Sequence, residues 1–343
     1  VVTAQKREQS LQDTPIALTA ITASTIDDLD IKNVVDMAGI SPNVMLVETP
    51  SNNTSATIAM RGGVTINPAI TWEPTVGVYL DGVYLGKTQG AIFDVVDLER
   101  VEILRGPQGT LYGRNTLGGA INLISQRPNG SGVETKLTLG NYGLTQAQFT
   151  TDFEIADGTY GKLVVNSKER DGYVHNAPGP YGGAQGVVPS ADPTVNELDT
   201  INSHGFRFTI ARDTDNSSFD LSVDYNDQSN TPPFAQLGYT IPNWSAAFGV
   251  GASPATGGLK LWPIELYTSK GRAKVAHVNE AVFEKSEVSG IALTYSRDTN
   301  LGTVKAILAR RDTEWSDNLD LDGGPFPIAN TSRYTDYTSE TFE

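Results

Sequence analysis

From Val133 onward the chain alternates between two classes of residue, and this two-residue period restricts its fold more than any other feature. In the stretches 133–140 and 147–155, apolar residues or threonine alternate with polar residues or glycine. Side chains of a β-strand point alternately to opposite faces, so each stretch predicts a strand with one apolar and one polar face. We predict strands at 133–140, 144–155, 159–170, 204–213, 218–228, 289–297, 302–313 and 333–342, the last two with less regular alternation.

The connections between these strands fall into two length classes. Segments 141–143, 156–158, 214–217 and 298–301 are short, whereas 171–203 and 229–288 are long and rich in Gly, Pro, Asn and Ser. Short turns at one rim and long loops at the other are typical of an outer-membrane β-barrel. A soluble β-sandwich or lectin also has alternating strands and long loops. The strand pattern alone leaves both architectures open.

Composition removes several classes of protein. The 25 Lys and Arg residues are outnumbered by 40 Asp and Glu, and the net charge of -15 argues against nucleic acid as a partner. The absence of cysteine excludes disulfides and thiolate metal sites. No apolar run reaches the about 18 residues of a transmembrane helix. Barrel strands need only about 9–11 residues each, so a β-type membrane protein stays open.

Residues before 129 have a mixed periodicity that predicts a compact α+β unit. A strand is predicted at 16–22, followed by a short helix around 34–37 that ends before Gly39 and Pro42. Asp81-Gly82 separates the alternating runs 76–80 and 83–85, which is a strong hairpin signal. Segment 105–128, RGPQGTLYGRNTLGGAINLISQRP, then has five glycines between 106 and 119. Such glycine density predicts tight turns and close approaches of the backbone.

These motifs carry a resemblance to a known family. Segment 96–128, VDLERVEILRGPQGTLYGRNTLGGAINLISQRP, resembles the signature at the end of the plug domain of TonB-dependent receptors. TIAMRGG at 57–63 and VGVYLDGVYLG at 76–86 occur upstream in the order that the family has. VVTA at 1–4 resembles the tail of the TonB box, the extended segment that the periplasmic protein TonB binds. The resemblance covers residues 1–128, and the strand pattern supports it beyond.

The resemblance implies an α+β plug domain followed by antiparallel transmembrane β-barrel strands. We expect the tail of the TonB box at 1–4, the plug domain at 5–130 and the N-terminal part of the barrel at 131–343. Plugged transporters have about 22 strands. At about 10 residues a strand, closure needs roughly 220 residues without loops. Since 131–343 is shorter than this, we expect the chain to be truncated and further strands to follow residue 343.

The implied function is active import through the outer membrane of a Gram-negative bacterium. TonB and its inner-membrane energising complex would supply the energy, and outer-membrane lipids would surround the barrel. A ferric siderophore is the first expected cargo, with oligosaccharide, cobalamin or another bulky organic compound as alternatives. No cofactor, metal site or enzymatic activity is expected. The alternative from a different class is a secreted all-β carbohydrate-binding protein or hydrolase.

The resemblance also implies roles for individual residues. Val1, Val2, Thr3 and Ala4 would bind TonB by main-chain strand pairing. The structural motif of the plug would consist of Arg61, Gly62, Arg105, Gly106, Gly109, Tyr112, Gly113, Arg114, Gly118 and Gly119. Its three arginines are expected to pair with carboxylates of the barrel wall. The substrate would contact the plug at Arg61, Trp72, Gln89 and Phe93, although Trp72 is equally expected to pack beneath a loop.

Motifs for catalysis or cation binding do not fit the sequence. GVYLGKT at 82–88 is one residue too short for a phosphate-binding loop and lies in a predicted hairpin. DNLDLDGG at 317–324 resembles a calcium loop but lacks the required spacing and the closing glutamate. We therefore predict that 317–324 is a solvated acidic loop.

Overall fold

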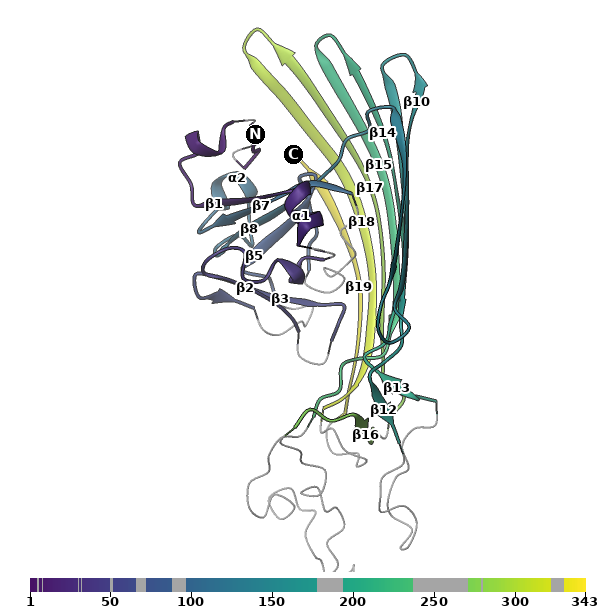
Figure 1. Ribbon diagram of the computed structural model, residues 1–343. Coiled ribbons are helices and arrows are strands. Elements are labelled where there is room, and N and C mark those ends of the chain that lie inside the picture. The colour runs from purple at the N-terminus through teal and green to yellow at the C-terminus, as the bar shows by residue number, and fades with distance from the viewer. Residues whose placement is uncertain are drawn as a thin grey trace, which may run out of the picture.

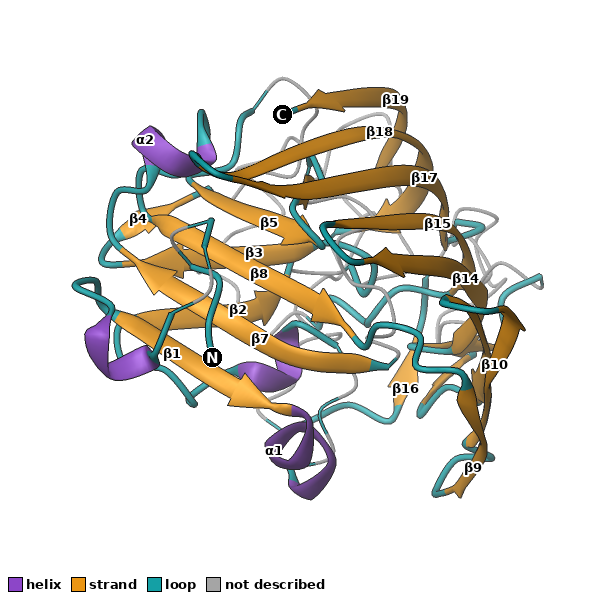
Figure 2. Ribbon diagram, turned by 90° about the horizontal axis from the view of Figure 1, so that it is seen from above, coloured by secondary structure: helices purple, strands orange, loops and turns teal. Residues whose placement is uncertain are grey.

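A tall curved sheet and a smaller α+β unit on its concave side make up the structure (Figures 1 and 2). The computed structural model describes residues 1–4, 6–7, 9–29, 31, 33–49, 52–65, 72–87, 97–177, 194–236, 271–278, 280–321 and 330–343. We call the tall sheet the wall and the described residues before Ser131 the plug region. Among the described residues, no helix is both long and apolar enough to cross a membrane.

The plug region is built on a mixed sheet of five strands in the order β1-β7-β8-β5-β6, with a second sheet in the order β2-β3-β4. The strands of the two sheets are β1 (Leu18–Thr22), β2 (Val44–Glu48), β3 (Ala56–Met60), β4 (Gly63–Val64), β5 (Val76–Leu80), β6 (Val83–Tyr84), β7 (Leu98–Arg105) and β8 (Gly119–Ser125). The helical elements are η1 (Leu11–Asp13), α1 (Ala23–Asp28), η2 (Val35–Met37) and α2 (Gly109–Tyr112). An α+β fold is therefore confirmed for this part of the chain.

The hairpin predicted at Asp81-Gly82 is present. Asp81 and Gly82 have φ angles of 51° and 90°, and two successive positive values are what a type I′ turn requires. The strands on either side, β5 and β6, pair through Tyr79 with Tyr84 and Leu80 with Val83. Beneath this sheet, buried residues including Ile21, Met37, Leu46 and Ile121 form the main core of the plug region, because β2, β3 and the helical segments cover that face.

The wall is an antiparallel meander. Among the described residues, eight strands pair in chain order when the small sheet of the long loops is left aside. They are β9 (Ser131–Leu139), β10 (Thr145–Ala156), β11 (Thr159–Arg170), β14 (Ile201–Thr214), β15 (Ser217–Asn230), β17 (Phe283–Thr299), β18 (Gly302–Asp320) and β19 (Asn330–Phe342). Each predicted strand is present, but β17 begins six residues earlier than predicted and β18 ends seven residues later.

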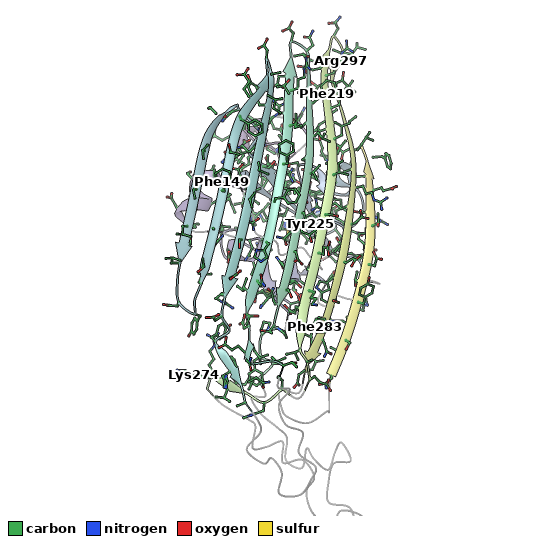
Figure 3. All side chains as sticks on the ribbon, turned by 90° about the vertical axis from the view of Figure 1, so that its right-hand side faces the viewer. Phe149, Phe219, Tyr225, Lys274, Phe283 and Arg297 are labelled. Carbon is green, nitrogen blue, oxygen red and sulfur yellow. The ribbon has the colours of Figure 1, made fainter. Side chains whose placement is uncertain are left out.

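The two faces of the wall differ as the alternation predicts. Phe149, Phe219 and Ile291 are 41%, 42% and 50% exposed on the outer face, which Figure 3 views directly. Buried polar residues such as Asp152 and Lys162 lie on the inner face, toward the plug region. A β-sandwich would bury the apolar faces of two sheets against each other. Because the apolar face of the wall is exposed and the polar one is covered, the β-sandwich alternative is wrong.

A small fourth sheet joins the bases of the two long connections and was not predicted. Its strands are β12 (Val174–Asn176), β13 (Glu197–Leu198) and β16 (Val275–Ala276), with β12 in the centre. Val174, Leu198 and Val278 belong to a separate buried apolar cluster at this sheet. Strands of two or three residues are too short to produce a period in the sequence.

One glycine of the motif is fixed by a close backbone approach. A Cβ atom at Gly119 would lie 2.3 Å from the carbonyl oxygen of Leu104 and 2.5 Å from the sulfur of Met60. Gly119 opens β8 and pairs with Arg105 of β7, so the strand cannot move away without losing its register. By contrast, a Cβ at Gly109 would meet nothing within 4 Å. The two glycines are therefore a matched pair for testing the motif.

We predict that Gly119→Ala lowers the free energy of unfolding by about 3 kcal/mol, because overpacked sites cost this order of energy and backbone must shift here. Gly109→Ala is expected to leave stability unchanged or to raise it by about 0.5–1 kcal/mol, because alanine is the better helix former. Chemical denaturation of the two purified variants measures both effects. Equal stability of the variants would contradict this account of Gly119.

Candidate functional site

The N-terminal segment 1–4 is docked on the plug region. Val2 forms a two-bond bridge with Gln9, with N···O distances of 2.9 and 3.0 Å. The Thr3 amide donates to Oε1 of Glu102 at 2.7 Å, and Ala4 is fully buried with its carbonyl accepting from the Tyr112 hydroxyl at 2.9 Å. Val1 alone of the four is largely exposed. Three of the four predicted TonB-binding residues, Val2, Thr3 and Ala4, are thus held through their main-chain groups.

Glu102 anchors this segment from inside the sheet. Its side chain is fully buried, and Oε1 also accepts from Nε of Arg100 at 2.8 Å. Its second oxygen, Oε2, has no hydrogen-bond partner among the described residues. A buried acceptor without a partner costs about 1–3 kcal/mol. The docked state therefore holds one carboxylate that is only half satisfied.

Tyr112 connects the glycine-rich motif to the same segment. Its hydroxyl accepts from Nδ2 of Asn122 at 2.6 Å while donating to Ala4, and its carbonyl accepts from the Tyr79 hydroxyl at 2.7 Å. Burial is the main cause that raises the pKa of Tyr112 to about 12, so the hydroxyl keeps its proton at neutral pH. The motif loop itself is closed by the amide of Gly106 donating to the carbonyl of Gly118 at 2.8 Å.

The arginines of the motif do not make the expected contacts. Among the described residues, Arg61, Arg105 and Arg114 form no ion pair with a wall carboxylate. The guanidinium of Arg61 lies over Gly106, where a Cβ would come within 2.6 Å of Nη1, and Nη1 of Arg105 donates to the carbonyl of Pro42 at 3.4 Å. The side chains of Arg61 and Arg105 thus contact neighbouring turns of the plug region. Arg127, at the junction with the wall, instead pairs with Asp213 and Asp220, each at 2.7 Å.

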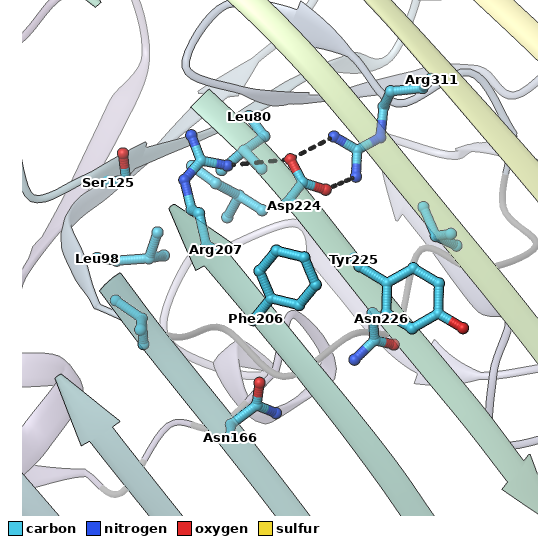
Figure 4. A pocket seen from close by; sticks show the side chains of 13 residues that line it. Leu80, Leu98, Ser125, Asn166, Phe206, Arg207, Asp224, Tyr225, Asn226 and Arg311 are labelled. Atoms are coloured by element: carbon cyan, nitrogen blue, oxygen red, sulfur yellow. Dashed lines mark hydrogen bonds and ion pairs between the residues drawn. The ribbon is translucent and has the colours of Figure 1, made fainter. Parts of the chain in front are cut away.

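The central contact between the plug region and the wall is a row of alternating charges (Figure 4). Asp81, in the hairpin turn, accepts from Nη2 of Arg207 at 2.5 Å. Nη1 of Arg207 donates to Oδ1 of Asp224 at 3.3 Å, and Arg311 binds both oxygens of Asp224, at 3.2 and 2.6 Å. The row borders a pocket of about 610 Å³, including the part open to solvent, that Leu80, Leu98 and Leu123 line from the plug side.

Strand register produces this row, and one glycine makes it possible. Arg207, Asp224, Gly290 and Arg311 are successive register partners on β14, β15, β17 and β18. Gly290 stands between the two paired residues, and a Cβ there would lie 2.7 Å from Nη1 of Arg311 and 3.1 Å from Oδ1 of Asp224. The missing side chain lets Arg311 reach across β17.

A plug loop makes a second polar contact, nearer the long loops. Nδ2 of Asn52 donates to Asp317 at 3.2 Å, the amide of Asn53 donates to Glu284 at 2.9 Å, and Nε1 of Trp315 donates to the Thr54 hydroxyl at 2.8 Å. Asp317 also pairs with Arg333. The prediction of a solvated loop from 317 is wrong in its first part, since β18 continues to Asp320 and Asp317 is buried.

The predicted substrate contacts are scattered or fall outside the described residues. Trp72 is 57% exposed, and Arg61 is also exposed, with its guanidinium beside Gly106. Gln89 and Phe93 lie in 88–96, outside the described residues. Sequence reasoning missed Arg207, Asp224 and Arg311, although each occupies a polar-face position of a predicted strand or its continuation. A charged residue on the polar face of a predicted strand was the signal that could have identified them.

We predict that Gly290→Leu lowers the free energy of unfolding by about 1–3 kcal/mol, because the new side chain separates Arg311 from Asp224. Ser289→Leu adds apolar volume at the preceding residue, on the outer face, and is expected to change stability by less than about 0.5 kcal/mol. Denaturation of both purified variants measures this. A stable Gly290→Leu variant whose plug region resists protease as well as the parent would refute the importance of the row.

Comparison with known proteins shows which family the plug region resembles. Residues 10–120 match the family model of the TonB-dependent Receptor Plug Domain. The vitamin B12 transporter BtuB of Vibrio vulnificus is 29% identical over 178 residues, which are 50% of this chain and 28% of that protein. The pesticin receptor of Yersinia pestis is 30% identical over 185 residues, which are 51% of this chain and 26% of that protein.

Solved structures extend the likeness to the wall. The ferric yersiniabactin uptake receptor FyuA from Yersinia pestis superposes with a TM-score of 0.70 at 18% identity, over 97% of this chain and 46% of that one. The open form of the ferric-catecholate import receptor Fiu from E. coli K12 gives 0.66 at 19% identity, over 97% and 46%. The chain thus spans less than half the length of these proteins. Residues 10–120 therefore match the plug domain of TonB-dependent receptors, and the fold of the chain resembles the plug and part of the barrel in these solved structures.

Proposed function

We propose that the protein is an outer-membrane receptor that imports a scarce, bulky nutrient with energy supplied by TonB. The observation that carries the proposal is the docked segment Val1–Ala4, joined to the plug by contacts that a pull from the periplasm would load directly. Within this proposal the chain divides into 1–4, 5–130 and 131–343. The change from the small mixed sheet to the meander, whose first strand begins at Ser131, supports the second boundary.

The outer face of the wall supports a location in lipid. Phe149, Val165, Phe206, Leu221 and Ile291 are each at least 38% exposed on neighbouring strands, and a soluble protein rarely exposes so large an apolar surface. Aromatic pairs lie on the same sheet, such as Phe219 with Tyr295, whose ring centroids are 4.6 Å apart. Polar residues toward the plug and apolar residues outward are the arrangement of a transmembrane barrel. We assign the protein to transport and not to catalysis.

The names of the relatives support a ferric siderophore as the first cargo to test. Fiu is named as a catecholate siderophore receptor, and FyuA as a ferric yersiniabactin uptake receptor. BtuB is named as a vitamin B12 transporter, which keeps cobalamin as the second candidate. Within the proposal, TonB pairs with the released N-terminal segment through main-chain hydrogen bonds. Side chains in the segment then matter less than the backbone amides.

We predict that proline in this segment abolishes import, because it removes an amide hydrogen from the strand that TonB would pair with. Successive amides of a strand point to opposite sides, so only one of the amides of Val1 and Val2 would face TonB. At least one of the two variants, Val1→Pro or Val2→Pro, should therefore reduce uptake of iron from ferric siderophores at least tenfold. Val1→Ala and Val2→Ala keep every amide and should import at close to the parental rate.

As a control, cargo binding is measured on de-energised cells, because these cells can bind cargo at the surface but cannot import it. Both proline variants should bind cargo as the parent does. Parental uptake by both proline variants, or uptake that survives deletion of TonB, would refute the proposed energy coupling.

A further inference from the structure

A polar pocket lies where the plug region meets the wall near the bases of the long loops. It encloses about 590 Å³, including the part open to solvent. Pockets of about 300–1,000 Å³ are the usual size for small organic ligands. β11, β14 and β15 contribute residues from the wall, while Glu48 of β2 and Asn53 lie on the plug side. All of the lining residues belong to the described part of the chain.

Strand register builds the wall side as a grid. Lys168, Ser203 and Gln228 are successive register partners on the three strands. One step closer to the long loops, the residues that face inward are Arg170, its register partner Ile201, and Asn230. Five of these six side chains are polar. They face one volume because strand residues two positions apart share a face.

Two buried groups in this grid have no hydrogen-bond partner among the described residues. They are Oγ of Ser203, a residue that is 2% exposed, and Nε of Arg170. Each such group is unfavourable unless something in the pocket forms a hydrogen bond to it. Both groups can donate a hydrogen bond. They call for an oxygen acceptor in the pocket, supplied by a ligand or by water.

The charges around the pocket are balanced. Lys168 and Arg170 are offset by Glu48 and Asp199, and Nη2 of Arg170 is already paired with Asp199 at 2.8 Å. Burial, followed by the negative charge of Asp199, raises the pKa of Glu48, which indicates that added negative charge is disfavoured at this point. An iron(III) tris-catecholate carries several negative charges and would need a cationic pocket.

We propose that this pocket binds a neutral, hydroxyl-rich ligand, a sugar or polyol. A hydroxyl group both donates and accepts, so it satisfies Ser203 and Arg170 as an acceptor and Glu48 as a donor. The inference rests on the proposed import function and narrows its cargo to the sugar class. It departs from the cargo that the names of Fiu and FyuA suggest.

Calorimetric titration of the purified full-length receptor with neutral oligosaccharides of increasing length tests the proposal. We expect binding that Ser203→Ala weakens by about threefold to tenfold, the effect of one neutral hydrogen bond. The melting temperature of this variant should not fall, because the hydroxyl it loses has no partner in the protein. Ser203→Leu fills the pocket and should remove binding. Ser222→Ala, at a buried serine of β15 outside the pocket, should bind as the parent does.

Three outcomes would overturn the proposal: no oligosaccharide binds, Ser203→Ala binds with parental affinity, or only an iron(III) tris-catecholate binds in a Ser203-dependent way. The first leaves water as the occupant of the pocket. TonB-dependent uptake is measured separately in cells. Uptake without sugar binding overturns this inference alone, and sugar binding without TonB-dependent uptake overturns the import function alone.

Discussion

The register of the wall strands is the constraint on which the rest of the structure depends. Every wall strand has one apolar and one polar face, so a slip of one residue in any strand would turn its polar residues outward and its apolar residues toward the plug. The charge row from Arg207 to Arg311 and the polar pocket around Ser203 are both products of this register. The two sites share β14 and β15 but use different rows of these strands.

The contact between plug and wall is mainly polar, which distinguishes it from the core of the plug. Inside the plug, residues such as Ile103 and Leu123 are fully buried among apolar neighbours. At the wall, Asp81 and Asp97 pair with Arg207 and Lys162. Water can replace such pairs at less cost than it can cover exposed apolar surface, because charged groups are well hydrated. The plug is therefore more cohesive internally than it is attached to the wall.

Sequence reasoning predicted the parts of the fold that have a period or a specific turn. The strands with an apolar outer face and the Asp81-Gly82 hairpin belong to this group. It did not predict the part of β18 beyond Thr313. The outward-facing residues there are Glu314, Ser316 and Asn318, and none of them is apolar, so the alternation is lost. Of the candidate site, the sequence predicted the N-terminal segment and the glycine motif. It could not predict the partner of Asp81, because Arg207 is more than a hundred positions away in the sequence. It could not predict the pairing of Asp317 with Arg333, because that contact depends on the register between two neighbouring strands.

The docking of the N-terminal segment has a mechanical consequence. Val2, Thr3 and Ala4 are held by separate contacts that follow one another along the chain. A force applied at Val1 loads these contacts one after another and not all together, as in peeling. The peak force needed is then set by the strongest single contact, while the total work is still their sum. Once Thr3 has left, water reaches the half-satisfied carboxylate of Glu102, and its hydration opposes return of the segment.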